Sequence, residues 1–91
     1  MGIPEPFDIV VSLAGHDAGR LYVVTGVSGE RLLLCDGKTR KLENPKCKSP
    51  KHVRVARRGG SAELSDRMIR ETIALTAAEA AAKEVRLLGK R

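Results

Sequence analysis

The sequence predicts a small, mainly β domain followed by a C-terminal helix. From Asp8 to about Ala56, β-branched residues cluster in short runs between glycine turns, a pattern typical of several short strands. From Ala74 to Ala82 alanine is frequent, so local helix propensity is high. A chain of 91 residues with only two aromatic residues has room for one modest core, which must be built from Val, Ile, Leu and Ala.

Residues 1–7, with two prolines, are expected to form an entry arm ahead of five strands. In the second strand, odd-numbered residues should face one side of the sheet and even-numbered residues the other, with Gly26 marking a bend or bulge. The third strand contains Leu32–Leu34 without alternation, as expected of a strand buried on both sides or curved round a barrel. The expected strands are Ile9–Leu13, Arg20–Val27, Arg31–Cys35, Lys38–Leu42 and Val53–Ala56.

Two connections between these strands carry turn signals. Ser28-Gly29-Glu30 should close the hairpin between the second and third strands. Asp36-Gly37 should close the next hairpin, because Asp-Gly is favoured where both central residues need positive φ. Residues 43–51 should form a basic loop stiffened by Pro45 and Pro50, each of which biases the preceding residue toward extended geometry.

The C-terminal third of the chain has helical signals. Residues 58–64 are expected to be a linker, with a hinge at Arg57-Arg58-Gly59-Gly60. Ser65 is the expected N-cap of a helical tail over residues 65–88, and Thr76-Ala-Ala-Glu79 has the form of a capping box. The tail is therefore either one long helix or two helices that meet near Thr76. It is either docked or loosely attached, because its apolar stripe is thin: Leu64, Met68, Ile69, Ile73, Leu87 and Leu88.

The net charge of +6 is concentrated in one part of the chain. Residues 36–58 hold nine Lys and Arg against two Asp and Glu, which gives 9 − 2 = +7 and accounts for the whole excess. Blocks of like charge repel one another and are typical of surfaces that meet a polyanion. A solvated face that only keeps the protein soluble is the alternative, but the single sign and the proline-stiffened loop favour a nucleic acid.

A glycine loop between the first two expected strands carries the most informative motif. It reads Gly15-His-Asp-Ala-Gly19-Arg20 and is followed by alternating valines. This stretch resembles the KOW motif, in which two strands flank a loop of the Gly-x-Asp-x-Gly-Lys/Arg type and a second glycine comes near the end of the motif. The matching residues are Gly15, Asp17, Gly19, Arg20, Val23, Val24, Val27 and Gly37.

The basic stretch that begins at Asp36 looks like that of short bacterial KOW-domain RNA-binding proteins, which are similar to large-subunit ribosomal proteins of archaea and eukaryotes. The resemblance covers roughly Asp8 to Ala56 and does not include the helical tail. It implies an SH3-like five-stranded barrel over residues 8–57 and RNA as the partner. It also implies that Gly15, Asp17, Gly19 and Gly37 are structural residues of the motif.

Cationic side chains of the basic block and of the glycine loop are the candidate RNA contacts. Stacking platforms for unpaired bases use Phe, Tyr, Trp or His, and here only Tyr22 and the two histidines could serve. Because Tyr22 is as readily core as surface, we expect folded RNA to be recognised through its phosphates and shape. The candidate RNA-binding residues are Arg20, Lys38, Arg40, Lys41, Lys46, Lys48, Lys51, His52, Arg54, Arg57 and Arg58.

Other chemistry has weaker support. A P-loop needs four residues between its glycines and then Lys and Ser/Thr, whereas three separate Gly15 from Gly19 and Arg-Leu follows. Cys35, Cys47, His16 and His52 lack the close ligand pair of closed zinc sites, and no Ser-His-acid motif is present. In His16-Asp17, the aspartate is expected to bond to backbone amides in a turn. We expect no enzyme, cofactor, metal or small-molecule substrate.

The expected location is the cytoplasm. The first twenty residues lack a basic start and a continuous apolar stretch, and no run approaches a membrane span, so we expect no membrane partner. The two cysteines are then expected to be free thiols.

Two hypotheses about function follow. The first is an RNA-binding protein associated with the ribosome or its assembly, which contacts structured rRNA through phosphates. The second is a protein-interaction adaptor of the transcription or translation machinery, since KOW domains of some transcription factors contact proteins. In that case the apolar stripe of the helix would carry the contact with ribosomal or transcription proteins.

Overall fold

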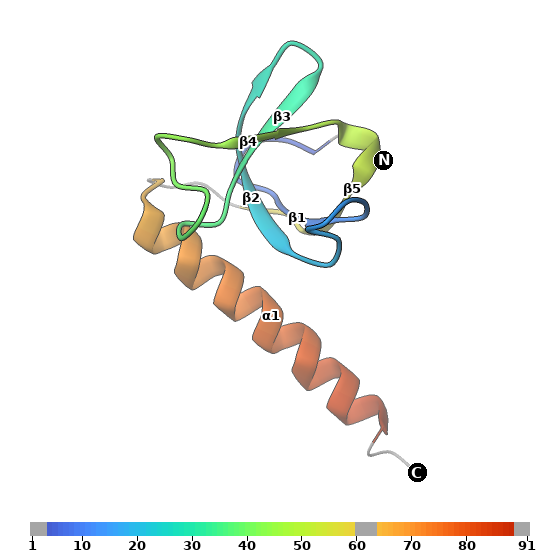
Figure 1. Cartoon of the computed structure of the whole chain (residues 1–91). Coiled ribbons are helices and arrows are strands. Elements are labelled where there is room, and N and C mark those ends of the chain that lie inside the picture. The colour runs from blue at the N-terminus through green and yellow to red at the C-terminus, as the bar shows by residue number, and fades with distance from the viewer. Residues whose placement is uncertain (1–3, 60–63, 89–91) are drawn as a thin grey trace.

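A computed structural model describes residues 4–59 and 64–88, with residues 83–88 described as backbone only. These residues form a five-stranded antiparallel sheet and one C-terminal helix, so the predicted mainly β fold with a C-terminal helix is confirmed (Figure 1). The elements are β1 (Ile9–Ser12), β2 (Leu21–Ser28), β3 (Arg31–Cys35), β4 (Lys46–Lys48), the 3-10 helix η1 (Pro50–His52), β5 (Val53–Arg57) and α1 (Asp66–Leu88).

The sheet has the strand order β4-β3-β2-β1-β5, so the last strand returns to pair beside the first. Its two edge strands, β4 and β5, are joined by residues 49–52 alone. Four strand spacings of about 4.8 Å would separate the edges of a flat sheet by about 19 Å. A connection of this length that includes a helical turn is too short to span that distance, because even a fully extended chain covers only about 3.5 Å per residue. The sheet therefore curls.

β2 bends at the predicted glycine. Val24 is opposite Leu34, but Gly26 is opposite Leu33, so the register shifts by one residue at a β-bulge. A Cβ at Gly26 would approach Leu33 Cδ1 to 3.4 Å, so the bulge also brings the two strands into close contact. Gly29, with φ of 62°, lies in the two-residue turn of the hairpin, as predicted.

The predicted alternation of β2 is confirmed, because its residues divide between two apolar clusters. Tyr22 and Val24 lie in the first cluster, which the curled sheet encloses. Val23 belongs to the second cluster, between the sheet and α1, with Ile69 of the helix. The first cluster also contains Val10, Leu32, Leu34 and Val53, and the second contains Ile9 and Cys35.

The predicted strand Lys38–Leu42 is wrong, and so is the description of residues 43–51 as a loop alone, because the fourth strand lies at Lys46–Lys48 and a 3-10 helix follows it. The Asp36 carboxylate explains the difference. Its Oδ1 accepts the Lys38 N–H at 2.9 Å and the Arg40 N–H at 2.8 Å, which folds these residues into a turn. Gly37 has a positive φ of 80°, whereas Asp36 does not, so the Asp-Gly pair starts a wide loop instead of a tight hairpin.

The helical tail is one continuous helix, and its first half is docked on the sheet. Ser65 Oγ accepts the Met68 N–H at 3.1 Å, which confirms the predicted N-cap. Of the two alternatives for the tail, one long helix is correct, because Thr76 is buried within the helix and donates its hydroxyl to Thr72 O at 2.9 Å. Ile69 is 1% exposed in the second cluster, against which Leu64 and Ile73 also pack.

The remainder of the apolar stripe does not contribute to this docking. Met68 is exposed, and the side chains of Leu87 and Leu88 lie outside the described residues. Beyond Thr76 the described residues of α1 are exposed, and the helix extends past the edge of the sheet in Figure 1.

Part of the predicted hinge is fixed to Asp8, the residue that precedes β1. Arg58 Nη1 donates to Asp8 Oδ2 at 2.6 Å, and the Gly59 N–H donates to Asp8 Oδ1 at 3.2 Å. Gly60 lies outside the described residues. Within the described ranges, no helix has the length and apolar character that crossing a membrane requires.

Gly37 joins the loop after β3 to the start of α1. The guanidinium of Arg70 donates to Gly37 O at 2.8 Å, and the Leu42 N–H donates to Asp66 Oδ1 at 2.9 Å. A Cβ at Gly37 would overlap Asp66 O and come within 2.7 Å of Arg70 Cγ.

We expect Gly37→Ala to destabilise the fold by about 2–3 kcal/mol, because backbone strain adds to a steric clash with the helix. Gly29→Ala is the matched control, since Gly29 also has a positive φ but no atom lies within 4 Å of its added Cβ. The control should lose only about 1–2 kcal/mol from backbone strain. Chemical denaturation of both variants measures the difference in the free energy of unfolding. Equal losses in the two variants would show that the clash between a Cβ at position 37 and the helix does not destabilise the fold.

Candidate nucleic-acid interface

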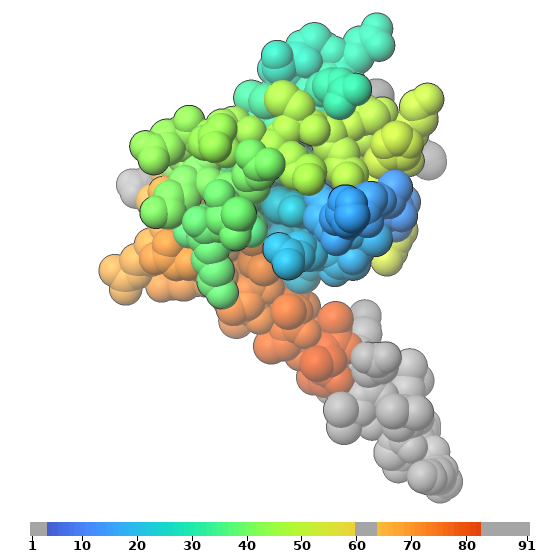
Figure 2. All heavy atoms as spheres, in the orientation of Figure 1, coloured from blue at the N-terminus to red at the C-terminus, as the bar shows by residue number. Residues whose placement is uncertain are grey.

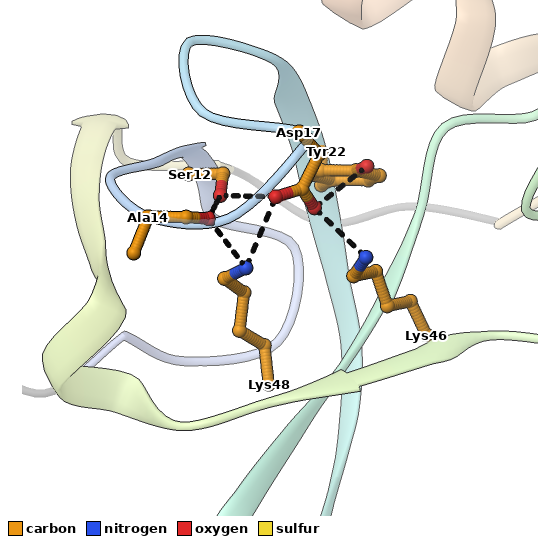
Figure 3. A network of polar contacts seen from close by, with 6 residues as sticks. All are labelled: Ser12, Ala14, Asp17, Tyr22, Lys46 and Lys48. Carbon is orange, nitrogen blue, oxygen red and sulfur yellow. Dashed lines mark hydrogen bonds and ion pairs between the residues drawn. The ribbon is translucent and has the colours of Figure 1, made fainter.

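The glycine loop is closed by its two glycines and fixed by the side chain between them. Gly15 and Gly19 have φ of 88° and 90°, and the Gly19 N–H donates to Ser12 O at 2.8 Å. This turn directs Asp17 inward, where it is 7% exposed (Figure 3). The predicted bonds from Asp17 to backbone amides are wrong, because its carboxylate instead accepts bonds from four side chains.

Each carboxylate oxygen of Asp17 has two partners, which together form the Asp17 network of Figure 3. Oδ1 accepts Ser12 Oγ at 2.9 Å and Lys48 Nζ at 3.1 Å. Oδ2 accepts Tyr22 OH at 3.1 Å and pairs with Lys46 Nζ at 3.0 Å. Lys48 Nζ also donates to Ala14 O at 3.0 Å. The network thus ties β4 to the glycine loop, two segments about thirty residues apart in the sequence.

These contacts shift the pKa values of both acidic groups in the network. Burial opposes ionisation of Asp17, but the hydrogen bonds from Lys46, Lys48, Ser12 and Tyr22 outweigh it and hold the pKa of this carboxyl well below its usual range. Burial, followed by the hydrogen bond to Asp17 and its negative charge, raises the pKa of Tyr22 to about 12. The network is therefore an ionised carboxylate held by cations, with a neutral phenol donating to it.

The titration of Tyr22 tests this arrangement directly. Because Tyr22 is the only tyrosine and the chain has no tryptophan, the ultraviolet absorbance of tyrosinate reports one residue. Its midpoint should lie near pH 12 in the natural chain and be lower in Asp17→Asn, which removes the negative charge but leaves the burial that is the larger cause of the raised pKa. A raised tyrosine pKa stabilises the fold below about pH 10, and that contribution is lost as the pH rises through about 12. An unchanged midpoint in Asp17→Asn would show that Asp17 does not act on the phenol.

A half-open pocket of about 240 Å³ lies beside the Asp17 network, between the glycine loop and the loop that follows β3. It brings together three of the predicted RNA-binding residues, Arg20, Arg40 and Lys46. Sequence reasoning did not assign the two hydroxyl-bearing residues of this basic pocket, Thr39 and Tyr22, to the site. Its lining residues are His16, Asp17, Arg20, Tyr22, Asp36, Thr39, Arg40 and Lys46.

The candidate residues besides Arg20 and Arg40 fall into two groups. Lys38, Lys41, Lys51, His52 and Arg54 are exposed, and none of them pairs with a carboxylate among the described residues. The second group makes ion pairs within the chain: Lys46 and Lys48 with Asp17, Arg57 with Glu79, and Arg58 with Asp8.

The glycine loop, the loop after β3 and β4 appear together on the viewed face in Figure 2. Arg20, Lys38, Arg40 and Lys41 belong to the first two of these segments. Four candidate cations that pair with no described carboxylate therefore lie on the two loops that border the pocket.

The cysteines are both free thiols in different environments. Cys35 is buried, its Sγ–H donates to Lys41 O at 3.4 Å, and burial raises its pKa. Cys47 is exposed on β4. Across the described side chains, no group of three or more His, Cys, Asp or Glu is placed to hold a metal ion.

Searches against protein-family models and against curated proteins give no match to this chain.

Proposed function

We propose that this protein binds folded RNA through the phosphates of its backbone and carries out no catalysis. The convergence of Arg20, Arg40 and Lys46 on one pocket is the observation that carries the proposal. Arg20 precedes the basic block by about twenty residues, so its presence beside Arg40 does not follow from the composition of that block. The glycine loop and the loop after β3 together present a cationic surface at this pocket. Such a surface is typical of proteins that bind nucleic acids.

The ion pairs define which cations remain for RNA. Nine Lys and Arg lie in residues 36–58, and four of them pair with carboxylates of the described residues, which leaves 9 − 4 = 5 without a described partner. Arg20 adds a sixth. The primary contacts of the proposed surface are therefore Arg20, Lys38, Arg40, Lys41, Lys51 and Arg54.

Burial of the tyrosine supports folded RNA as the target. Tyr22 is 3% exposed and its hydroxyl donates to Asp17, so its ring has no free face for an unpaired base. Phe7, the other aromatic residue of the chain, lies in the N-terminal arm and not on the two cationic loops. The imidazoles of His16 and His52 are exposed but small, so most of the affinity should come from charge and shape, which suits the regular backbone of a helical or compact RNA.

The fold is compatible with the KOW resemblance. The curled sheet, with β5 returning beside β1, is the arrangement expected if the strands close into an SH3-like barrel. The glycine loop has positive φ at both of its motif glycines, and Asp17 between them has a structural role. Under this proposal the protein acts in the cytoplasm on rRNA, as a component or visiting factor of a ribosomal subunit.

The alternative function as a protein-interaction adaptor loses part of its basis in the structure. Ile69, Ile73 and Leu64, which were expected to contact a partner, pack against the sheet of the same chain. Met68 and Leu75 remain exposed on the helix. Isolated exposed apolar residues are common on protein surfaces and do not by themselves mark an interface.

Sedimentation of cell lysate distinguishes these two functions. We expect the protein to migrate with ribosomal subunits at low salt and to leave them at high salt or after ribonuclease treatment, because phosphate contacts are screened by salt. Association that survives both treatments would favour the adaptor function and contradict the proposal.

A further inference from the structure

The basic pocket has a net positive charge that the described carboxylates do not neutralise. Asp17 pairs with both Lys46 and Lys48, which leaves 2 − 1 = +1 in the network. Arg20 and Arg40 add two positive charges at the pocket, and neither guanidinium pairs with a described carboxylate. Asp36 subtracts one, so the pocket and its neighbour Lys48 hold a net charge of +2.

The two carboxylates in the wall both accept hydrogen bonds from within the chain. All four hydrogen bonds that Asp17 accepts come from side chains of its network. Asp36 uses Oδ1 to accept the Lys38 and Arg40 amides, and this bond fixes the backbone from which the Arg40 side chain extends. Asp17 thus holds Lys46 and Lys48 beside the pocket, and the negative charge of Asp36 is outweighed by the surrounding cations.

The size of the pocket limits the anion to a small group. Sites for drug-sized ligands measure about 300–1,000 Å³, whereas this pocket has about 240 Å³ and is half open. The buried ring of Tyr22 offers no stacking surface for a base. A phosphate group with its attached ribose fits these limits, and paired N–H donors of arginine are well suited to phosphate oxygens.

We propose that the basic pocket is a subsite for a single phosphate group of the RNA backbone with its adjoining ribose. Arg20 from the glycine loop and Arg40 from the loop after β3 contact the same phosphate from two sides, and Thr39 lies beside the ribose. Asp17 is a positioning residue, which holds Lys46 at the edge of the subsite. This inference rests on the proposed RNA-binding function and adds that one phosphate is held by two loops at once.

A double-mutant cycle tests whether Arg20 and Arg40 share a phosphate. Arg20→Gln and Arg40→Gln should each lower the affinity for an RNA hairpin by about tenfold, as expected for loss of a charged hydrogen bond. The affinity of the double variant should fall by about tenfold to thirtyfold in total. Once the first substitution has weakened the hold on the shared phosphate, the second arginine has little left to contribute. Arg20→Gln with Arg54→Gln is the matched control, and its losses should multiply to about a hundredfold, since Arg54 lies on β5 and outside the pocket. Multiplicative losses in the Arg20 and Arg40 pair would overturn the shared-phosphate proposal.

A second measurement examines the pocket without RNA, so that failure of RNA binding and failure of the subsite are distinguishable. Titration of the full chain with ribose 5-phosphate, followed by NMR, should shift the Arg20, Thr39 and Arg40 signals and leave those of Lys51 and Arg54 unchanged. Shifts spread equally over all these residues would overturn the subsite, even if RNA binds. Shifts confined to the pocket in a chain that does not bind RNA would overturn only the proposed function. Adenosine 5′-monophosphate is the comparison ligand, and binding at least tenfold tighter than ribose 5-phosphate would instead assign the pocket to a free nucleotide.

Discussion

Replacing Lys38, Arg40 and Lys41 with glutamate should lower the affinity for folded RNA by about 10³-fold at about 0.1 M salt. Lys38 and Lys41 are exposed, and Arg40 lines the basic pocket. None of the three pairs with a described carboxylate, so each charge is available to a phosphate and each glutamate would repel one. Fluorescence anisotropy of a labelled RNA hairpin measures the loss.

The control for this variant reverses two exposed cations outside the candidate surface, Arg31 in β3 and Arg67 in α1. If affinity depended only on net charge, each reversal in the control would cost as much as each reversal in the triple variant. We expect the control to lose less than about tenfold, because these residues lie outside the two cationic loops. Equal losses per reversed charge, or unchanged affinity in the triple variant, would contradict the assignment of these residues.

The second large effect is expected at Asp17, whose replacement by alanine should destabilise the fold by about 2–4 kcal/mol. The substitution leaves Lys46 and Lys48 as neighbouring positive charges without a counterion and removes the acceptor of Tyr22 and Ser12. The estimate is at the lower end for a buried pair because the lysine side chains are partly exposed and can turn to solvent. Urea denaturation measures it.

Glu30→Ala serves as the control for Asp17→Ala, since Glu30 is exposed in the turn after β2 and makes no described ion pair. Its effect should stay within about 0.5 kcal/mol. A similar loss of stability in both variants would show that the Asp17 network does not hold the fold together.

The stabilisation by Asp17 also depends on pH in a defined direction. Its folded pKa lies below the unfolded value of about 3.9, so its contribution is complete above that value and is lost as the pH falls toward the folded pKa. The stability difference between the natural chain and Asp17→Ala should therefore be largest near pH 7 and smaller at about pH 3. A difference that stays constant over this range would mean that packing, and not charge, explains the effect of the substitution.

Local rules predicted most of the fold. The alternation of β2 predicted that its two faces would pack in different surroundings, and they lie in two apolar clusters. Gly26 and Gly29 predicted the bulge and the β2–β3 turn, and Ser65 predicted the start of the helix. The fourth strand was missed because its inward-facing residues are lysines. Lys46 and Lys48 face Asp17 across the curled sheet, so β4 has the polar composition of a loop.

The sequence predicted which residues belong to the site but not which of them lie together. Arg20 and Arg40 were both candidates, but their position at one pocket depends on how distant strands pair, and a single sequence does not reveal that pairing. One signal was present in Lys46-Cys47-Lys48, where the spacing of two places both cations on the same face of a strand. Two lysines on the buried face of a strand need an acidic partner, and in the structure that partner is Asp17 of the glycine loop.

The salt dependence of affinity for a folded RNA hairpin is the most direct test of the proposed function. Six cations without internal ion pairs, and up to eight with Lys46 and Lys48, predict a slope of roughly −4 to −7 for log affinity against log salt. An unstructured RNA of equal length should bind more weakly, because the ring of Tyr22 is buried and only the smaller imidazoles of His16 and His52 are exposed near the cations. A slope close to zero, or tighter binding of the unstructured RNA, would contradict recognition of folded RNA through its phosphates.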